Sequence, residues 1–188
     1  MMLIYVIRHG ESESNLQQLW TGWLDAPLTE KGRNDAEKTR ELLKNVPFDK
    51  VFSSDLHRAM ETAAIATPHH EAVPTPLLRE VNIGSLAGQP LSVLTMEQRA
   101  EIFEDGYESF GGESQRAFAG RVAAVMDEIS ALPCDTVALF SHAGFLRGML
   151  DIVLGTRLPT THIRCKNCTV AIFEYTNKAW CLHSWINL

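Results

Sequence analysis

Met2-Leu3-Ile4-Tyr5-Val6-Ile7 forms an unbroken apolar run, and Arg8-His9-Gly10 follows it directly. A second run, Thr136 to Phe140, leads in the same way into Ser141-His142-Ala143-Gly144. Both runs are short, rich in β-branched or aromatic residues and bounded by glycine, which predicts buried strands. If these strands are neighbours in a parallel sheet, both histidines emerge at its carboxyl edge, where open α/β sheets place their binding crevice.

Strand-like and helix-like stretches alternate along the rest of the chain. Helices are expected from an N-cap at Thr29 to about Asn45, over 56–66, from an N-cap at Ser114 to Leu132, and over 144–153. Strands are expected at 50–53 and in a hairpin at the sheet edge, 169–175 with 180–186. This pattern predicts an α/β fold: a three-layer sandwich with a mostly parallel central sheet and helices on both faces.

The length of 188 residues suits one domain with a sizeable core. We expect a single domain over 1–188, with a small cap insertion at about 84–112, a less regular stretch that is rich in glycine. The cap carries an acidic patch, and Arg99 is the one basic residue in this stretch. The same charges fit a solvated surface helix equally well. The members of the patch are Glu97, Glu101, Glu104, Asp105 and Glu108.

The net charge of −6 argues against nucleic acid or an anionic membrane as the main partner. A local cluster of arginine and histidine can still bind a small anion. No stretch approaches the roughly 20 apolar residues of a membrane span, and the start of the chain lacks the basic region and cleavage site of a signal peptide. We therefore expect a cytoplasmic protein and leave open whether it forms a homodimer.

The cysteines are too sparse for a disulfide scaffold. Cys165 and Cys168 have C-x-x-C spacing, but a zinc site would need a second such pair, for which Cys181-Leu182-His183 is a poor substitute. A redox motif should open a helix, whereas this pair precedes a strand-like stretch. Unpaired structural thiols are the better interpretation.

Four side chains near predicted strand ends supply groups that phosphoryl transfer needs. His9 is a candidate nucleophile, since a neutral imidazole can attack phosphorus in line and split hydrolysis into two easier steps. Arg8 and Arg58 would bind phosphate oxygens through forked, charge-assisted hydrogen bonds. His142, protonated beside the phosphate dianion, would add a third positive partner. Such fixed charges are catalytic because negative charge spreads over the phosphoryl oxygens during transfer.

Glu80 is the candidate general acid. A carboxyl group beside a phosphate keeps its proton more readily because like charges repel, so it can protonate the departing alcohol and later draw a proton from water. The remaining histidines lack comparable context, and we expect structural or solvated roles for His57, His69, His70, His162 and His183.

Together these motifs resemble the histidine phosphatase superfamily, also called the phosphoglycerate-mutase-like family. The resemblance covers nearly the whole chain in order: Arg8-His9-Gly10-Glu11-Ser12 with Asn15, Thr21-Gly22-Trp23, Pro27 to Gly32, Ser53 to Ala59 with Thr62-Ala63, Leu78-Arg79-Glu80 with Gly84 and Gly88, Gly111-Gly112-Glu113-Ser114, and Ser141-His142-Ala143-Gly144. One departure is Ala87, where the phosphatase branch often has glutamate.

The resemblance implies a phosphohistidine at His9, a phosphate pocket formed by Arg8, Arg58 and His142, and Glu80 as proton donor. It further implies that Asn15, Thr21 and Gly22 line the substrate side, and we expect Ala143 to join the phosphate pocket. No metal or organic cofactor is implied.

Within this family we favour a metal-independent, acid-phosphatase-type phosphomonoesterase acting on small phosphate esters and releasing inorganic phosphate. The family's mutases grip a bisphosphate with lysine and paired arginines, whereas 81–141 has no lysine and only three separated arginines. The acidic cap should repel a doubly anionic substrate of the phosphoglycerate type. Aromatic residues are candidates for an apolar leaving-group pocket, although loop aromatics often have structural roles: Trp20, Trp23, Tyr107 and Phe110.

The short-chain branch with Gly-Gly-Glu-Ser resembles α-ribazole phosphatases and broad-specificity sugar-phosphate phosphatases, and the sequence does not choose between them. Two other functions stay open. One is mutase-type phosphoryl transfer, and the other is a catalytically silent phosphate- or phosphoprotein-binding module, since fold does not fix function.

Overall fold

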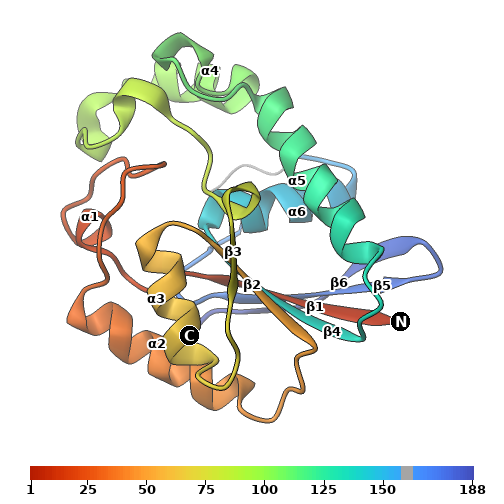
Figure 1. Cartoon of the computed structure of the whole chain (residues 1–188). Coiled ribbons are helices and arrows are strands. Elements are labelled where there is room, and N and C mark those ends of the chain that lie inside the picture. Colours follow the sequence, from red (N-terminus) through yellow and green to blue (C-terminus); the bar gives the residue numbers. More distant parts are fainter. Residues whose placement is uncertain (158–162) are drawn as a thin grey trace.

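The structure is a computed structural model that describes residues 1–157 and 163–188; His162 lies outside the described residues. Its centre is a six-stranded sheet with the order β3-β2-β4-β1-β5-β6 (Figure 1). Four strands are parallel to one another: β1 (Met2–Arg8), β2 (Lys50–Ser54), β3 (Val73–Thr75) and β4 (Thr136–Ser141). β5 (Val170–Thr176) pairs antiparallel with β1, and β6 (Ala179–Ile186) pairs antiparallel with β5. β1 and β4 pair directly, with Arg8 opposite Ser141. The predicted parallel neighbours are confirmed.

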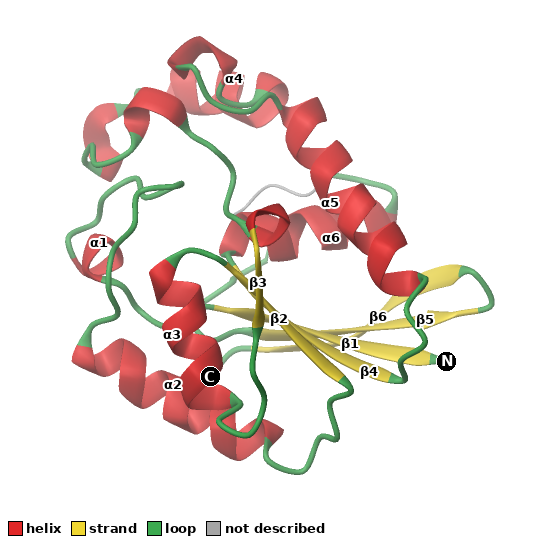
Figure 2. Ribbon diagram, viewed as in Figure 1, coloured by secondary structure: helices red, strands yellow, loops and turns green. Residues whose placement is uncertain are grey.

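Helices cover both faces of this sheet, which confirms the three-layer sandwich (Figure 2). On one face lie α2 (Glu30–Leu43) and α3 (His57–Ala66), and on the other lie α5 (Gln115–Ser130) and α6 (Ala143–Leu154). The alternation along β1 explains this division, because successive strand residues face opposite sides. Ile4 and Val6 pack toward α5 and α6, whereas Ile7 packs toward α2 and α3.

The helix starts follow the predicted caps. The Thr29 hydroxyl accepts a hydrogen bond from the Gly32 N–H (3.0 Å), and the Ser114 hydroxyl accepts one from the Ala117 N–H (3.1 Å). The helices end at Leu43 and Ser130, within two residues of the expected positions. The predicted hairpin is present at the sheet edge, where Asn177 and Lys178 turn with positive φ.

Two short elements were not expected. α1 (Glu13–Leu16) interrupts the loop after β1, held by a capping box between Ser12 and Asn15. The edge strand β3 is only three residues long and contains Pro74, which cannot donate to a sheet and is tolerated there because the edge leaves its nitrogen unpaired.

The cap segment, residues 84–112, contains α4 (Met96–Asp105) and short 3-10 helices at Gly84–Leu86, Leu91–Val93 and Glu108–Phe110. α4 lies away from the sheet (Figure 1). Leu86, Leu94 and Ile102 bury a small apolar cluster of their own with Ile83. Among the described residues, no helix is both long and apolar enough to cross a lipid bilayer.

Candidate active site at the carboxyl edge of the sheet

The ends of β1 and β4 bring His9 and His142 together, with ring centroids 5.1 Å apart and both residues buried. The His9 Nδ1 lies 2.6 Å from the Gly10 carbonyl oxygen, a contact that requires the proton on Nδ1. Nε2 therefore carries the lone pair, and it accepts a hydrogen bond from Arg58 Nε at 3.3 Å. Burial, Arg58 and Arg8 lower the pKa of His9 well below 6.5. His9 is a neutral imidazole with its lone pair on Nε2.

Arg58 is the second residue of α3 and is almost completely buried. Its two terminal nitrogens donate to the carbonyl oxygens of Gly22 and Leu24, both at 2.8 Å. Burial lowers the pKa of Arg58 to about 10, so it remains a cation at neutral pH. The guanidinium is thus fixed by the backbone of the 21–24 loop while its Nε points to His9.

Arg8 ends β1, and one terminal nitrogen donates to the Cys165 carbonyl. Its Nε is buried and has no hydrogen-bond partner among the described residues. Because an unsatisfied buried donor costs about 1–3 kcal/mol, this nitrogen is suited to an acceptor supplied by a ligand.

His142 is the residue at the N-cap position of α6 and is fully buried, and its Nε2 lies 2.9 Å from the Ser54 hydroxyl. Burial, Arg58 and His9 lower the pKa of His142 well below 6.5. His142 is therefore neutral in this structure, whereas the sequence analysis gave it a positive charge beside a phosphate.

Glu80 follows the short turn Pro76–Leu78 and faces the start of α6. One carboxylate oxygen accepts the Gly144 N–H at 3.1 Å, and the other accepts the Val81 N–H at 2.9 Å. A Cβ at position 144 would lie 2.1 Å from the carboxylate, so only glycine permits this approach.

The backbone carbonyl of Glu80 is also held in place. It accepts hydrogen bonds from Trp23 Nε1 (2.7 Å) and from Arg121 (3.1 Å). Arg79, next to Glu80, stacks on the Trp23 ring at 4.8 Å and forms a two-bond ion pair with Asp55. The candidate acid is therefore fixed at both its side chain and its backbone.

A cleft of about 660 Å³ opens at this edge of the sheet. Eight of the predicted site residues line it: Arg8, His9, Asn15, Thr21, Gly22, Arg58, Glu80 and Ala143. His142 lies beside His9 but is fully buried and is not among the residues that line the cleft. Asn15 is oriented by Asn167, whose amide donates to its side-chain oxygen at 3.0 Å. The motifs at the start of the chain, at Arg58, at Glu80 and at Ala143 are therefore brought together around one cleft.

The acidic patch of the cap does not face the cleft. All five of its carboxylates are exposed and none lines the cleft, whereas the cap contributes Leu91, Phe103 and Tyr107 to the lining. The argument that the cap repels a doubly anionic substrate is therefore wrong, because those charges point to solvent. Of the aromatic candidates, Trp20 and Tyr107 line the cleft, and Trp23 and Phe110 do not.

Sequence reasoning missed two arginines of the cleft, Arg147 and Arg157. A signal for Arg147 existed: Gly144, Arg147, Gly148 and Asp151 follow the i, i+3, i+4, i+7 spacing of one helix face, and all four line the cleft. Arg157 lies beyond the end of α6 and has no such pattern to reveal it.

The described residues contain no group of three or more His, Cys, Asp or Glu side chains that could hold a metal ion. Cys165 and Cys168 are free and buried, and burial raises the pKa of both thiols, to about 11 for Cys168. Neither is an activated thiolate, in agreement with the structural role expected for them.

The chain belongs to the histidine phosphatase superfamily (branch 1), whose family model matches residues 4–188. Among its relatives, the protein named "Probable phosphoglycerate mutase GpmB" from Proteus mirabilis is 31% identical over 99% of this chain and 91% of its own length. An Escherichia coli structure described as a candidate α-ribazole-5′-P phosphatase has a TM-score of 0.84 at 25% identity, covering 100% of this chain and 98% of that one.

A phosphoserine phosphatase from Entamoeba histolytica, solved in complex with 3-phosphoglyceric acid, has a TM-score of 0.86 at 24% identity and covers 100% of this chain and 98% of that one. At this identity the likeness establishes the fold. The similar proteins therefore include both phosphatases and a protein named as a mutase, and the resemblance stated from the motifs is confirmed.

Proposed function

We propose that this protein is a metal-independent phosphomonoesterase that hydrolyses small phosphate esters through a phosphohistidine at His9. The observation that carries the proposal is the state of His9: a neutral ring that donates its Nδ1 proton to the Gly10 carbonyl, so that the lone pair lies on Nε2, where it accepts a hydrogen bond from Arg58 Nε. That lone pair can attack phosphorus once Arg58 Nε turns to a phosphoryl oxygen. The cations that phosphoryl transfer needs are provided by arginine side chains, which supports a reaction without a metal ion.

The proposed reaction has two steps. In the first, His9 Nε2 forms a bond to phosphorus while the bond from phosphorus to the alcohol oxygen breaks, and the Glu80 carboxyl gives its proton to that oxygen. In the second, water attacks phosphorus as the phosphorus–nitrogen bond breaks, and the Glu80 carboxylate accepts the proton from water. Inorganic phosphate leaves and both residues return to their first states.

In this scheme Arg8, Arg58 and His142 bind the phosphoryl oxygens. The incoming dianion would raise the low pKa of His142 by attraction between opposite charges, so His142 becomes a third cation only when phosphate is present. Asn15, Thr21, Gly22 and Ala143 complete the walls around the ester.

The test is phosphate release in the presence of a chelator, measured for wild type and His9→Ala over 3-phosphoglycerate, sugar phosphates and α-ribazole phosphate. We expect release that survives the chelator and falls at least about 10³-fold in His9→Ala. His69→Ala, at an exposed histidine outside the cleft, is the matched control and should retain activity. Release that the chelator abolishes would refute metal independence, and a fully active His9→Ala would refute the nucleophile.

Mutase-type transfer is a second candidate, supported by the relative named as a phosphoglycerate mutase and by the two unforeseen arginines in the cleft. In that case a substrate hydroxyl, in place of water, takes the phosphoryl group from His9. The same assay separates the two: conversion of 3-phosphoglycerate to its 2-isomer without phosphate release would favour the mutase. Binding of inorganic phosphate with neither reaction would favour a silent binding module.

A further inference from the structure

The Gly-Gly-Glu-Ser motif, residues 111–114, packs against the segment that carries Glu80. The Glu113 N–H donates to the Asn82 carbonyl oxygen at 2.8 Å, and one Glu113 carboxylate oxygen accepts the Asn82 N–H at 2.7 Å. Gly112 makes a close approach to the same backbone, since a Cβ there would lie 2.3 Å from the Asn82 carbonyl oxygen. The motif therefore holds both backbone groups of Asn82, two residues after the candidate acid.

Arg121 of α5 holds the backbone on the other side of Glu80. Its guanidinium donates to the carbonyl oxygens of Leu77 (2.9 Å), Arg79 (2.8 Å) and Glu80 itself (3.1 Å). A planar guanidinium presents its donors in a fixed fork, so three carbonyl groups bound to it are fixed relative to one another.

Glu113 and Arg121 are also bound to each other. Nε of Arg121 lies 2.9 Å from one carboxylate oxygen, and a terminal nitrogen lies 2.7 Å from the other. With the three carbonyl contacts this makes five hydrogen bonds, which matches the five N–H donors of a guanidinium. The two side chains are only 13% and 17% exposed, so solvent screens this ion pair less than a surface pair.

Neither member of the pair is placed to touch an ester, because neither lines the cleft. Both act on the backbone at Glu80, whose carboxylate in turn accepts the Gly144 and Val81 N–H groups. A general acid must lie within hydrogen-bond reach of the oxygen that it protonates, and a misplacement of about 1 Å can lower a rate about 10²-fold. A group that fixes this backbone therefore controls proton transfer without taking part in it.

We propose that Glu113 and Arg121 are positioning residues for the candidate general acid: the pair holds the chain before and after Glu80, and so places its carboxyl group at the departing oxygen. This inference rests on the proposed function for the acid role of Glu80. It gives the Gly-Gly-Glu-Ser motif a role in proton transfer.

The test compares leaving groups that differ in their need for a proton. An alkoxide leaves poorly unless an acid protonates it, whereas p-nitrophenolate is a stable anion that leaves without one. The two substrates are p-nitrophenyl phosphate and the alkyl ester that wild type hydrolyses best in the panel above. The measured quantity is kcat/KM, which reports the steps up to departure of the alcohol and excludes the later attack by water.

In Arg121→Lys and in Glu113→Gln, kcat/KM for the alkyl ester should fall at least about tenfold, while that for p-nitrophenyl phosphate stays within about threefold of wild type. Arg116→Lys makes the same change at an exposed position of α5 outside the cleft and should leave both values unchanged. Glu113→Gln added to Glu80→Gln should lower the alkyl value by less than about twofold, since no acid is left to position.

Circular dichroism identifies the folded variants, and Glu113→Gln, which keeps the shape of the side chain, answers the question if Arg121→Lys does not fold. Equal losses for the two esters, or no loss for either, would overturn the inference. Wild type that cleaves p-nitrophenyl phosphate but no alkyl ester has no working acid, which overturns the inference and leaves the phosphohistidine standing.

The proposed nucleophile fails separately from the positioning pair. If His9→Ala remains active and the two variants still discriminate between the esters, His9 is not the nucleophile but Glu113 and Arg121 position the acid. If wild type cleaves neither ester, both the proposed hydrolase and the positioning role are refuted.

Discussion

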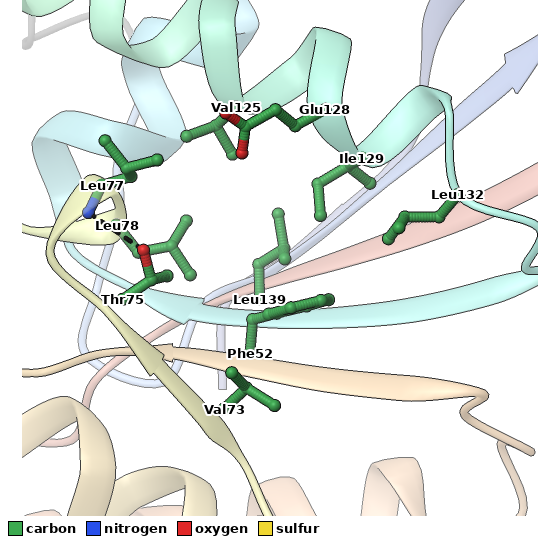
Figure 3. A pocket seen from close by; sticks show the side chains of 10 residues that line it. All are labelled: Phe52, Val73, Thr75, Leu77, Leu78, Val125, Glu128, Ile129, Leu132 and Leu139. Atoms are coloured by element: carbon green, nitrogen blue, oxygen red, sulfur yellow. Dashed lines mark hydrogen bonds between the residues drawn. The ribbon is translucent and has the colours of Figure 1, made fainter.

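Two hollows in the described part of the structure differ in their chemistry. The cleft of about 660 Å³ at the carboxyl edge is lined by four arginines and two carboxylates among its residues. A groove of about 190 Å³ between α5 and the β3 edge is lined by apolar side chains, with Glu128 as the one charged residue in its lining (Figure 3). In Figure 3, Val125 and Ile129 of α5 face Leu139 and Phe52 of the sheet across it.

The difference follows from where each hollow lies along the strands. The groove lies beside β2, β3 and β4, where alternate side chains belong to the core and are apolar. The cleft lies where parallel strands end, so the chain turns there and polar side chains and free backbone groups converge. A hollow alone therefore does not indicate a function, whereas buried donors that lack acceptors do.

The largest contrast is expected from Arg58→Ala against Leu77→Ala. Removing a buried cation that faces the attacking nitrogen should lower kcat/KM by at least about 10²–10³-fold. Leu77→Ala should change it less than about twofold, because Leu77 lines the groove and not the cleft. Steady-state kinetics on both variants, with circular dichroism to confirm folding, tests this. If kcat/KM falls equally in Arg58→Ala and Leu77→Ala, the loss reflects destabilised folding in both variants and no specific role of Arg58.

Gly144→Ala should lower kcat by roughly 10²-fold, because the new Cβ displaces the Glu80 carboxylate and small misplacements of a catalytic group have effects of this size. Gly120→Ala is the matched control in α5, where a Cβ meets nothing within 4 Å. It should keep full activity and gain about 0.5–1 kcal/mol in unfolding free energy. A normal kcat in Gly144→Ala would remove Glu80 from the proton-transfer role.

The buried histidines predict that stability depends on pH. Because the folded-state pKa of His9 and of His142 lies well below 6.5, the unfolded chain binds more protons as pH falls below that value. The unfolding free energy should therefore fall on acidification, by up to about 2 kcal/mol per histidine between pH 7 and pH 5. Urea unfolding of wild type and of the double variant His9→Asn/His142→Asn measures it.

The double variant should lose much less stability over the same pH range, and Gly120→Ala should follow wild type. If the double variant is as sensitive to acid as wild type, the two histidines are not the groups that couple folding to protons, and their neutral state in the folded protein is contradicted.

The smallest effect is expected at the groove itself. Val73→Thr, at a half-exposed position on the edge strand, should change unfolding free energy by less than about 1 kcal/mol and leave activity within twofold. Thermal unfolding and the phosphate-release assay measure both. A loss of activity in Val73→Thr would show that a change in the groove alters catalysis in the cleft.

The sequence predicted the parts of the site that depend on strand ends. His9 and His142 follow buried runs of clear pattern, and parallel pairing then leaves them one place to meet. It did not predict β3, since three residues with a proline carry too little pattern. The sequence could not predict whether the cap acids and Arg157 face the cleft or the solvent. The direction of a charged side chain in an irregular segment depends on packing against distant residues, such as Phe103 against Arg157.

The 21–24 loop makes the candidate phosphate ligand and the candidate acid mechanically dependent on each other. Its Gly22 and Leu24 carbonyls hold Arg58, and its Trp23 indole holds the Glu80 backbone. A shift of this loop would move Arg58 and Glu80 together. Phosphate binding and proton transfer should therefore be lost together. Substitutions at Trp23 and Arg58 should accordingly be non-additive in a double-mutant cycle, with a coupling energy of about 0.5–3 kcal/mol.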